Sequence, residues 1–303
     1  MPQSLAINAQ HVKAQFNRRA PLDTAQFLYG EIAQRLLQRL SYIRLQPERI
    51  LDAGCGAGHA IDPLRARYVE MEYVGVDHSP ALLAVAEERH GYAPSLWQRL
   101  RKKTQNSPIF VEADMAKTGL APQSFDLIWS NLALHWHPDP EQVFEEWRRL
   151  LAPERLALFS SFGPTTLQEL RHALQSADIS TATMNFVDMH DYGDMLLQHG
   201  FNDPVMDQEI ITLTYQSAER LLQDVQALGG NPNPQRRPIG RADFLRLLQA
   251  LEAQRHMDGT IHLSIEVAYG HAWRNSTQRK GSEVFVPISS IQKAPPKNKP
   301  QPI

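Results

Sequence analysis

The chain has 303 residues, 42% of them hydrophobic, which is enough for one substantial core or a core domain with a lobe. A formal net charge of -2 favours neither nucleic acid nor an anionic membrane as a partner. The chain has one cysteine, Cys55, no secretory signal pattern and no apolar run of the ~20 residues that cross a bilayer, so we expect a cytoplasmic protein, and we take it to be a monomer.

The first part of the chain, residues 1–46, is expected to form a helical lid segment, because Phe27, Ile32 and Leu36 recur at the spacing of one helix face. Residues 47–163 then alternate short apolar strands with helices. This alternation favours an α/β core with a mainly parallel sheet and right-handed crossovers. Strands are expected at residues 49–52, 73–77, 109–111, 125–131 and 156–160, and helices from near Gly58, at 81–89 and at 140–151.

Residues 164–274 are expected to complete the same domain with further helices and two strands, at 210–215 and 261–273, that suit an antiparallel edge. The predicted fold is therefore a doubly wound, seven-stranded, mainly parallel sheet of the Rossmann-like kind. Residues 275–303 are polar and rich in proline and lysine, so we expect a disordered tail there.

A glycine-rich turn follows the first strand and is the strongest signal in the sequence. The run from Leu51 to Gly58 reads LDAGCGAG, with glycines at 54, 56 and 58. Glycine permits unusual backbone dihedrals and lets the backbone approach a ligand closely. The helix that follows would point its N-terminus at that ligand. We therefore place Asp52, Gly54, Cys55, Gly56 and Gly58 in a cofactor site, with Cys55 as a small spacer.

Acids at the ends of the next strands extend this site. Asp77 ends the second strand, where an acid takes ribose hydroxyls in this architecture, and Asp114 ends the third, within reach of an adenine amino group. We add their neighbours His78 and Met115, and Asn131 at the end of the fourth strand. Asp126, which begins the fourth strand, is expected to be structural.

The order of the glycines and acids distinguishes between two cofactors. Nicotinamide dinucleotide sites read G-x-G-x-x-G, whereas this loop reads G-x-G-x-G with His59 in the sixth place. Asp52 also precedes the glycines, and a carboxylate there suits a cationic amino group and opposes a pyrophosphate. S-adenosylmethionine (SAM) carries an ammonium and a sulfonium. The pattern therefore favours SAM and matches motif I of class I methyltransferases.

Several further segments carry a resemblance to one family. Residues 130–136 (SNLALHW), 16–20 (FNRRA), 162–171 (FGPTTLQELR) and 228–231 (LGGN) resemble malonyl-acyl carrier protein O-methyltransferases, the entry enzymes of bacterial biotin synthesis. The resemblance covers roughly residues 10–273. It implies methyl transfer from SAM to the free carboxylate of a malonyl thioester, carried by an acyl carrier protein or by coenzyme A, with residues 164–274 on the acceptor side.

The resemblance also suggests acceptor residues. Arg171, on the helix after the fifth strand, is our candidate for the cation that holds the malonyl carboxylate, because guanidinium binds carboxylate bidentately. A surface arginine paired with Glu169 or Asp178 is the alternative. His135 and Trp136 are expected to shape a dry acceptor pocket, with ordinary packing as the alternative. His135 and His137 lack a third ligand at convincing spacing, so we predict no metal.

The chain departs from the family at the lid. Members usually carry a tyrosine a few residues after the F-x-R-x-A element, whereas here Pro21-Leu22-Asp23 follows and the next tyrosine is Tyr29. The same segments also resemble mitochondrial complex I assembly factors, which are thought to bind SAM yet hydroxylate an arginine of a partner. Hydroxylation of that kind, or a non-catalytic SAM-binding docking module, remains an alternative function.

A carrier protein is acidic, so its docking face should be basic. Two runs offer one: Arg236-Arg237 with Arg241, and Arg99-Arg101-Lys102-Lys103 in the insertion at residues 91–107. An ordinary solvated charge run is the alternative for each.

Overall fold

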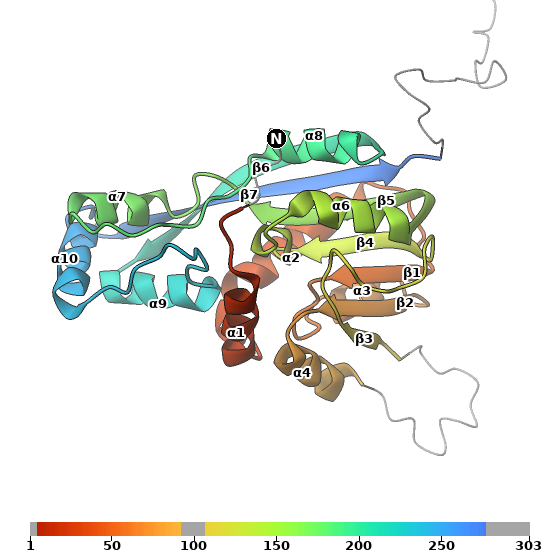
Figure 1. Ribbon diagram of the computed structural model, residues 1–303, viewed down its shortest axis with the longest axis horizontal. Helices are drawn as coiled ribbons and strands as arrows, with labels where there is room; N and C mark the ends of the chain where they lie inside the picture. The colour runs from red at the N-terminus through yellow and green to blue at the C-terminus, as the bar shows by residue number, and fades with distance from the viewer. Residues whose placement is uncertain (1–4, 92–106, 277–303) are drawn as a thin grey trace, which may run out of the picture.

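A seven-stranded sheet forms the centre of the protein, in the order β3-β2-β1-β4-β5-β7-β6 (Figure 1). The computed structural model describes residues 5–91 and 107–276. The strands are β1 (Arg49–Ala53), β2 (Glu72–Asp77), β3 (Ile109–Glu112), β4 (Phe125–Asn131), β5 (Leu151–Phe162), β6 (Phe201–Tyr215) and β7 (Ile261–Arg274). The predicted fold class is confirmed, including the two late strands at the edge.

The order of the strands creates a crevice. Strands β3, β2, β1, β4 and β5 run parallel, and only β7 and β6 are antiparallel to their neighbours. The chain winds outward from β1 to β3 and then returns to place β4 on the other side of β1. Ligands of open α/β sheets bind at such a reversal, outside the carboxyl ends of the strands.

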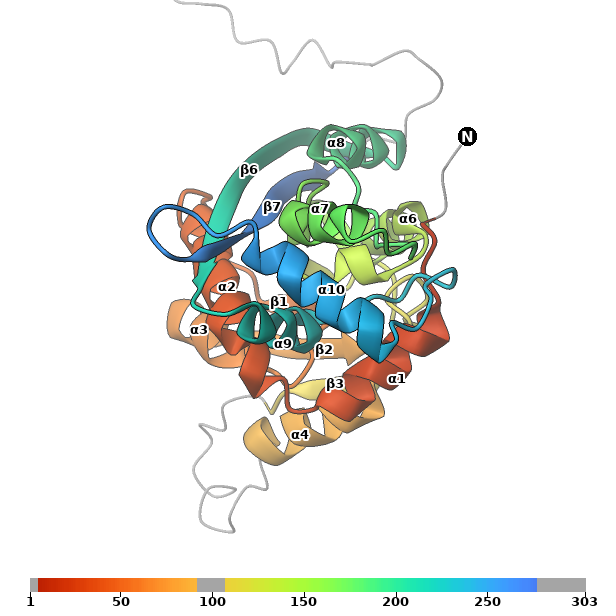
Figure 2. The same cartoon turned by 90° about the vertical axis from the view of Figure 1, so that its left-hand side faces the viewer.

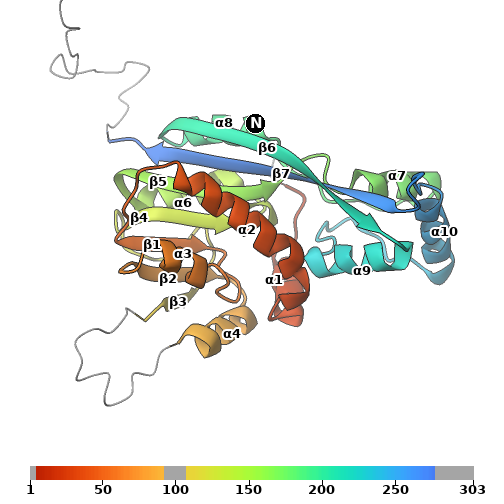
Figure 3. The ribbon, with the colours of Figure 1, turned by 180° about the vertical axis from the view of Figure 1, so that it is seen from behind.

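Helices cover both faces of the sheet. On the face seen in Figure 3 lie α2 (Gln26–Ser41) and α3 (Ile61–Arg67), and on the face seen in Figure 1 lie α6 (Pro140–Leu150) and α8 (Met189–Gln198). Helix α4 (Pro80–His90) begins where the sequence suggests, because the Ser79 hydroxyl accepts a hydrogen bond from the Leu82 N–H and Pro80 takes the first helical position.

The long β6–β7 pair reaches beyond the core and carries a helical lobe. Helices α7 (Gln168–Ser176), α9 (Ala218–Leu228) and α10 (Arg241–Glu252) gather at its far end (Figure 2), and α1 (Ala9–Arg19) lies between this lobe and the core (Figure 1). Short 3-10 turns η1 (Asp23–Ala25) and η2 (Leu134–Trp136) complete the elements. In the part of the chain that is described, no helix is long and apolar enough to span a bilayer.

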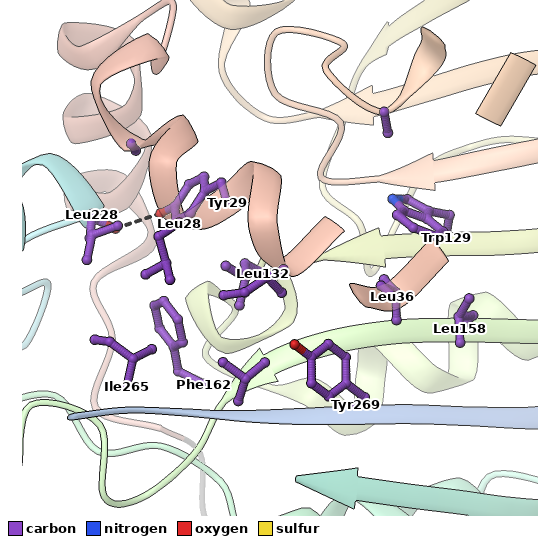
Figure 4. Packing of buried hydrophobic residues seen from close by; sticks show 14 of the residues in the cluster. Leu28, Tyr29, Leu36, Trp129, Leu132, Leu158, Phe162, Leu228, Ile265 and Tyr269 are labelled. Atoms are coloured by element: carbon purple, nitrogen blue, oxygen red, sulfur yellow. Dashed lines mark hydrogen bonds between the residues drawn. The ribbon is translucent and has the colours of Figure 1, made fainter. Parts of the chain in front are cut away.

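The main hydrophobic cluster runs from the core into the lobe. Leu28, Leu36, Leu158 and Ile265 are almost completely buried in it, and they come from α2, β5 and β7 (Figure 4). The N-terminal helices are therefore part of the core as well as a cover over the sheet.

Two elements begin at other residues than expected. The helix expected near Gly58 begins at Ile61, because the glycine turn continues through Ala60. Strand β6 begins at Phe201, well before the expected strand at 210–215, because the added residues pair with the end of β7. Helix α2 is tied to the sheet edge by Arg35 and Arg39, which form ion pairs with carboxylates of β6, and Arg39 also stacks 3.6 Å from the centre of the Tyr269 ring.

Candidate active site

A cavity of about 410 Å³ lies where β1, β2 and β4 end. Its floor includes Asp52, Asp77 and Asn131, and its cover includes Phe16 of α1 and Tyr29 of α2. The volume falls within the range of sites for small molecules and cofactors. The helical lid segment and the sheet therefore enclose one site together.

The glycine turn lines this cavity with backbone. Gly54, Gly56 and Gly58 have φ of 82°, 53° and 76°, the left-handed region that glycine adopts readily. A Cβ atom at Gly54 would lie 2.2 Å from the Cβ of Ala133, and one at Gly58 would lie 2.9 Å from the His90 ring. Gly54 and Gly56 line the cavity, whereas Gly58 is needed for the turn itself.

Asp52 is a buried acid on the cavity floor. Only 2% of its surface is exposed, and one carboxylate oxygen accepts a hydrogen bond of 2.5 Å from the Tyr73 hydroxyl. Burial raises the pKa of Asp52 to about 7, the Tyr73 hydrogen bond opposes this shift, and the charge of Asp77 adds to it. A cationic ligand group in the cavity would favour the ionised form.

Asp77 is held in place by backbone groups. Its two oxygens accept hydrogen bonds from the Ser79 N–H at 2.8 Å and the Gly56 N–H at 2.9 Å, so it connects β2 to the glycine turn. Burial raises the pKa of Asp77, and the His78 charge and these N–H groups oppose the shift. Each carboxylate oxygen has a further lone pair for a ligand hydroxyl.

The remaining predicted cofactor residues also line the cavity. Asp114 pairs with His137 at 3.2 Å, and this hydrogen bond holds the pKa of Asp114 below its usual range. Met115 lies against the glycine turn. His78 contributes a buried Nε2 that has no hydrogen-bond partner among the described residues.

Asn131 and Cys55 have structural contacts as well. The Asn131 amide donates to the Tyr29 carbonyl, and its side-chain oxygen accepts from Ser160, so it ties β4 to α2 and β5. Burial raises the pKa of Cys55, and its sulfur occupies the space that a side chain at Gly75 would need. The thiol is therefore neutral and acts as packing in the turn.

The lid departs from the family pattern in a specific way. Leu22, just after α1, lines the cavity next to Gly56, and Tyr29, on α2, also lines the cavity. The Tyr29 hydroxyl donates a hydrogen bond of 2.6 Å to the Leu228 carbonyl at the end of α9 (Figure 4). Burial raises the pKa of Tyr29 to about 12, and the nearby charge of Arg19 opposes this shift. Tyr29 is thus a neutral hydrogen-bond donor in the cavity wall.

Trp136 and His135 are adjacent but differently placed. The Trp136 ring lines the cavity and packs on Gly229, where a Cβ would lie 2.1 Å from the ring. His135 is completely buried behind it, between Trp136 and Phe162, and accepts a hydrogen bond from the Phe162 N–H. Burial lowers the pKa of His135 to about 3, so this imidazole is neutral.

Arg171 does not line the cavity. Its guanidinium donates to the Thr166 carbonyl at 2.5 Å and to the Pro164 carbonyl at 2.7 Å, whereas the Glu169 carboxylate accepts hydrogen bonds from the N–H and hydroxyl of Ser264. Two of its donors thus hold the loop between β5 and α7. Whether Arg171 also contacts an acceptor stays a prediction.

Sequence reasoning missed the contacts between the lid and the lobe. The Tyr29 hydroxyl donates a hydrogen bond to the Leu228 carbonyl, and the Arg19 guanidinium donates one of 3.0 Å to the Ala227 carbonyl. Two carbonyls at the end of α9 therefore accept hydrogen bonds from side chains of α1 and α2. The Gly229-Gly230 pair is the sequence feature that marks this contact. Gly229 has φ of 145°, and a side chain there would collide with the Trp136 ring.

The residues present fit SAM. A buried carboxylate suits the ammonium, Asp77 suits ribose hydroxyls, and the unpartnered His78 nitrogen and the glycine backbone leave polar groups for the ligand. The strand order and the place of these residues define a class I SAM-dependent methyltransferase. Residues 51–159 match the methyltransferase-domain family, in agreement with this class.

Whole-chain relatives give the particular family. The chain is 39% identical over 272 residues to a malonyl-(acyl-carrier protein) O-methyltransferase of Gallionella capsiferriformans, covering 91% of that protein, and 38% identical over 271 residues to one of a Methylovorus species, covering 90%. This chain belongs to the malonyl-(acyl-carrier protein) O-methyltransferase family. Among solved structures, the YcgJ protein of Bacillus subtilis shares the fold, with a TM-score of 0.56 at 15% identity over 80% of this chain and 99% of that one.

Proposed function

We propose that this protein methylates the free carboxylate of malonyl-acyl carrier protein, with SAM as the methyl donor. The family relatives bear this activity in their names. The product would be the methyl ester of malonyl-carrier. The resemblance to the family implies that biotin synthesis begins with this ester. A malonyl thioester of coenzyme A has the same reacting carboxylate and is the second possible form of the acceptor.

The observation that carries the proposal is the construction of the cavity. One side presents the buried acids Asp52 and Asp77, which suit the charge and hydroxyls of SAM. Another side is the ring of Trp136, backed by the neutral His135. A site of this kind places a methyl donor beside an apolar wall, where a carboxylate nucleophile loses its water.

The chemistry requires alignment more than proton transfer. A carboxylate is ionised at neutral pH, so no general base is needed. SAM supplies an electrophilic methyl group, and a new carbon–oxygen bond forms as the carbon–sulfur bond breaks. The protein contributes by excluding water and by holding the oxygen, methyl carbon and sulfur in line. In this proposal Trp136 and Tyr29 form the wall nearest the acceptor.

Arg171 has a positioning role in this proposal. It holds the carbonyls of Pro164 and Thr166, while the buried Glu266 accepts hydrogen bonds from the Thr165 N–H at 2.7 Å and hydroxyl at 2.6 Å. The loop after β5 is therefore fixed from both sides. A fixed loop keeps Phe162 against His135 and so keeps the aromatic wall in place.

The test uses defined carrier proteins. The protein is incubated with SAM and either malonyl- or acetyl-carrier, and each carrier is weighed by mass spectrometry. We expect the gain of one methyl group on the malonyl form alone, since the acetyl form lacks the nucleophilic carboxylate. The same incubation is repeated with malonyl-coenzyme A. Tight SAM binding without methyl transfer to malonyl-carrier or malonyl-coenzyme A would reject this function and favour the hydroxylase or docking alternatives.

A further inference from the structure

The connection between α9 and α10 presents a basic and apolar surface to solvent. The side chains of Arg236, Arg237 and Arg241 are exposed, and no carboxylate in residues 5–91 or 107–276 pairs with them. Asp243, the one acid between residues 234 and 246, is already paired with Arg246 at 2.6 Å. We call the following residues the arginine strip: Arg236, Arg237, Ile239, Arg241, Phe244 and Leu245.

The apolar members of the arginine strip are unusually accessible. Ile239, Phe244 and Leu245 are 39%, 41% and 52% exposed, and they are interspersed with the three arginines between residues 236 and 245. Exposed apolar side chains that are rimmed by charge mark surfaces that bind other proteins. A run of charges that served only to keep the surface solvated would not require exposed apolar side chains.

One end of the arginine strip, Arg236, lies against α1, a helix that covers the cavity. The Asn8 N–H donates a hydrogen bond of 3.1 Å to the Pro232 carbonyl, and the Arg236 guanidinium lies 3.4 Å from a ring nitrogen of His11. The connection between α9 and α10 therefore contacts α1 (Figure 2). The neighbouring residues Gln10 and Lys13 of α1 line the cavity itself. A partner seated on the arginine strip would therefore meet α1 at the Arg236 end, while Phe244 and Leu245 of α10 extend its surface to the outer end of the lobe (Figure 1).

The connection is held firmly for a segment without regular structure. The side-chain amides of Asn231 and Asn233 donate to the Ala182 and Thr183 carbonyls at 2.6 and 2.9 Å, and the Arg237 N–H donates to the Thr181 hydroxyl at 3.0 Å. A surface that is ordered before it binds loses less conformational entropy on association.

The positive field continues onto α1. The pKa of His11 is lowered, first by burial and then by the charges of Arg236 and Arg18. Arg18 is exposed on the same helix. Electrostatic complementarity of this extent speeds association with an acidic protein and sets its orientation.

We infer that the arginine strip is the docking surface for the acidic carrier protein that brings the malonyl group. This inference rests on the proposed function and specifies its partner surface. The guanidinium groups would pair with carboxylates of the carrier, and Phe244 and Leu245 would pack against its apolar residues. Of the two basic runs considered from the sequence, the other, at residues 99–103, lies outside the described residues.

The experiment compares two acceptors that share one reaction. Steady-state rates are measured with malonyl-carrier and with malonyl-coenzyme A for the wild type, the double variant Arg237→Glu/Arg241→Glu, and Phe244→Ala. The matched control is Arg44→Glu, an exposed arginine between α2 and β1 at the opposite ends of the strands. Affinity for S-adenosylhomocysteine reports whether each variant is folded.

We expect the double variant to lower kcat/KM for malonyl-carrier roughly tenfold or more, while the malonyl-coenzyme A value and S-adenosylhomocysteine affinity stay within about twofold. Phe244→Ala should act in the same direction, and Arg44→Glu should change neither acceptor. Raising the salt concentration should weaken only the carrier reaction of the wild type.

Three results would overturn the inference. If the double variant loses kcat/KM equally with both acceptors, the arginines act on the thioester or malonyl group. If its kcat/KM with malonyl-carrier is unchanged, the carrier docks elsewhere. A change in association state of the double variant, seen by sedimentation, would make the strip a contact between copies of this chain. A wild type that methylates neither acceptor rejects the proposed function itself, a result distinct from these three.

Discussion

The pKa of Asp52 leads to a measurable pH dependence of cofactor binding. Burial raises this pKa to about 7 in the free protein. If the ligand ammonium pairs with the ionised carboxylate, affinity must fall as protons occupy Asp52. With a pKa of about 7, the fraction of ionised Asp52 falls roughly fifteen-fold between pH 7 and pH 5.5, and the dissociation constant should rise by about the same factor.

The assay is calorimetric titration with S-adenosylhomocysteine over this pH range. The ligand ammonium stays protonated throughout, because α-amino groups titrate near ~7.7 or above. The variant Asp52→Asn, which keeps the oxygen that accepts from Tyr73, should bind more weakly at pH 7 and lose most of the pH dependence. An analogue without the amino acid moiety, methylthioadenosine, should bind the wild type with little dependence on pH.

The same shift predicts an effect on stability. The folded protein binds the Asp52 proton more tightly than the unfolded chain, whose pKa is near 3.8, so ionisation opposes folding progressively as pH rises from about 4 to 7. Above pH 7 the cost is on the order of 4 kcal/mol. Asp52→Asn should therefore raise the Tm of the ligand-free protein at pH 8. An unchanged Tm, together with the same pH dependence of binding in Asp52→Asn and wild type, would refute this reasoning.

Three further substitutions test the rest of the site. Gly54→Ala places a Cβ 2.2 Å from Ala133 at φ of 82°, so it should cost about 1–3 kcal/mol of stability in thermal unfolding and abolish SAM binding. Tyr29→Phe leaves the buried Leu228 carbonyl without its donor, so KM for the malonyl acceptor should rise while kcat with saturating SAM changes less, an effect of about 1–3 kcal/mol; unchanged kinetics would show that this contact does not close the site. Arg171→Ala should lower both Tm and kcat by loosening the loop after β5, with partial recovery in Arg171→Lys, whereas a loss confined to acceptor KM at unchanged Tm would restore its role as the carboxylate ligand.

The glycine turn was predictable because its determinants are local. Asp52, the three glycines and Asp77 lie within 26 residues of chain, and each has a requirement that can be read from sequence: a dihedral, a close approach or a strand end. The structure adds how they are held, with Asp77 connecting the turn to β2 through Gly56. The antiparallel edge was predicted in part: β7 was expected almost over its full length, whereas only residues 210–215 of β6 (Phe201–Tyr215) were expected as a strand.

The acceptor side was less predictable because its contacts join distant residues. Trp136 meets Gly229, and Tyr29 meets Leu228, pairings that no local pattern indicates. Arg171 has the right chemistry for a carboxylate, yet its nearest acceptors are carbonyls of its own loop. Tyr29, the next tyrosine along the chain after the expected lid position, lines the cavity from α2.

The central claim, methyl transfer to the terminal carboxylate of a malonyl thioester, is tested most directly by locating a labelled methyl group. Malonyl-carrier is treated with the protein and SAM that bears a ¹³C methyl group, and the prosthetic arm is then released and fragmented in the mass spectrometer. We predict that the label lies on the malonyl carboxylate and is lost as methanol on mild alkaline treatment, as an ester requires. A label on the carrier polypeptide, or no label on either protein or thioester, would contradict the account.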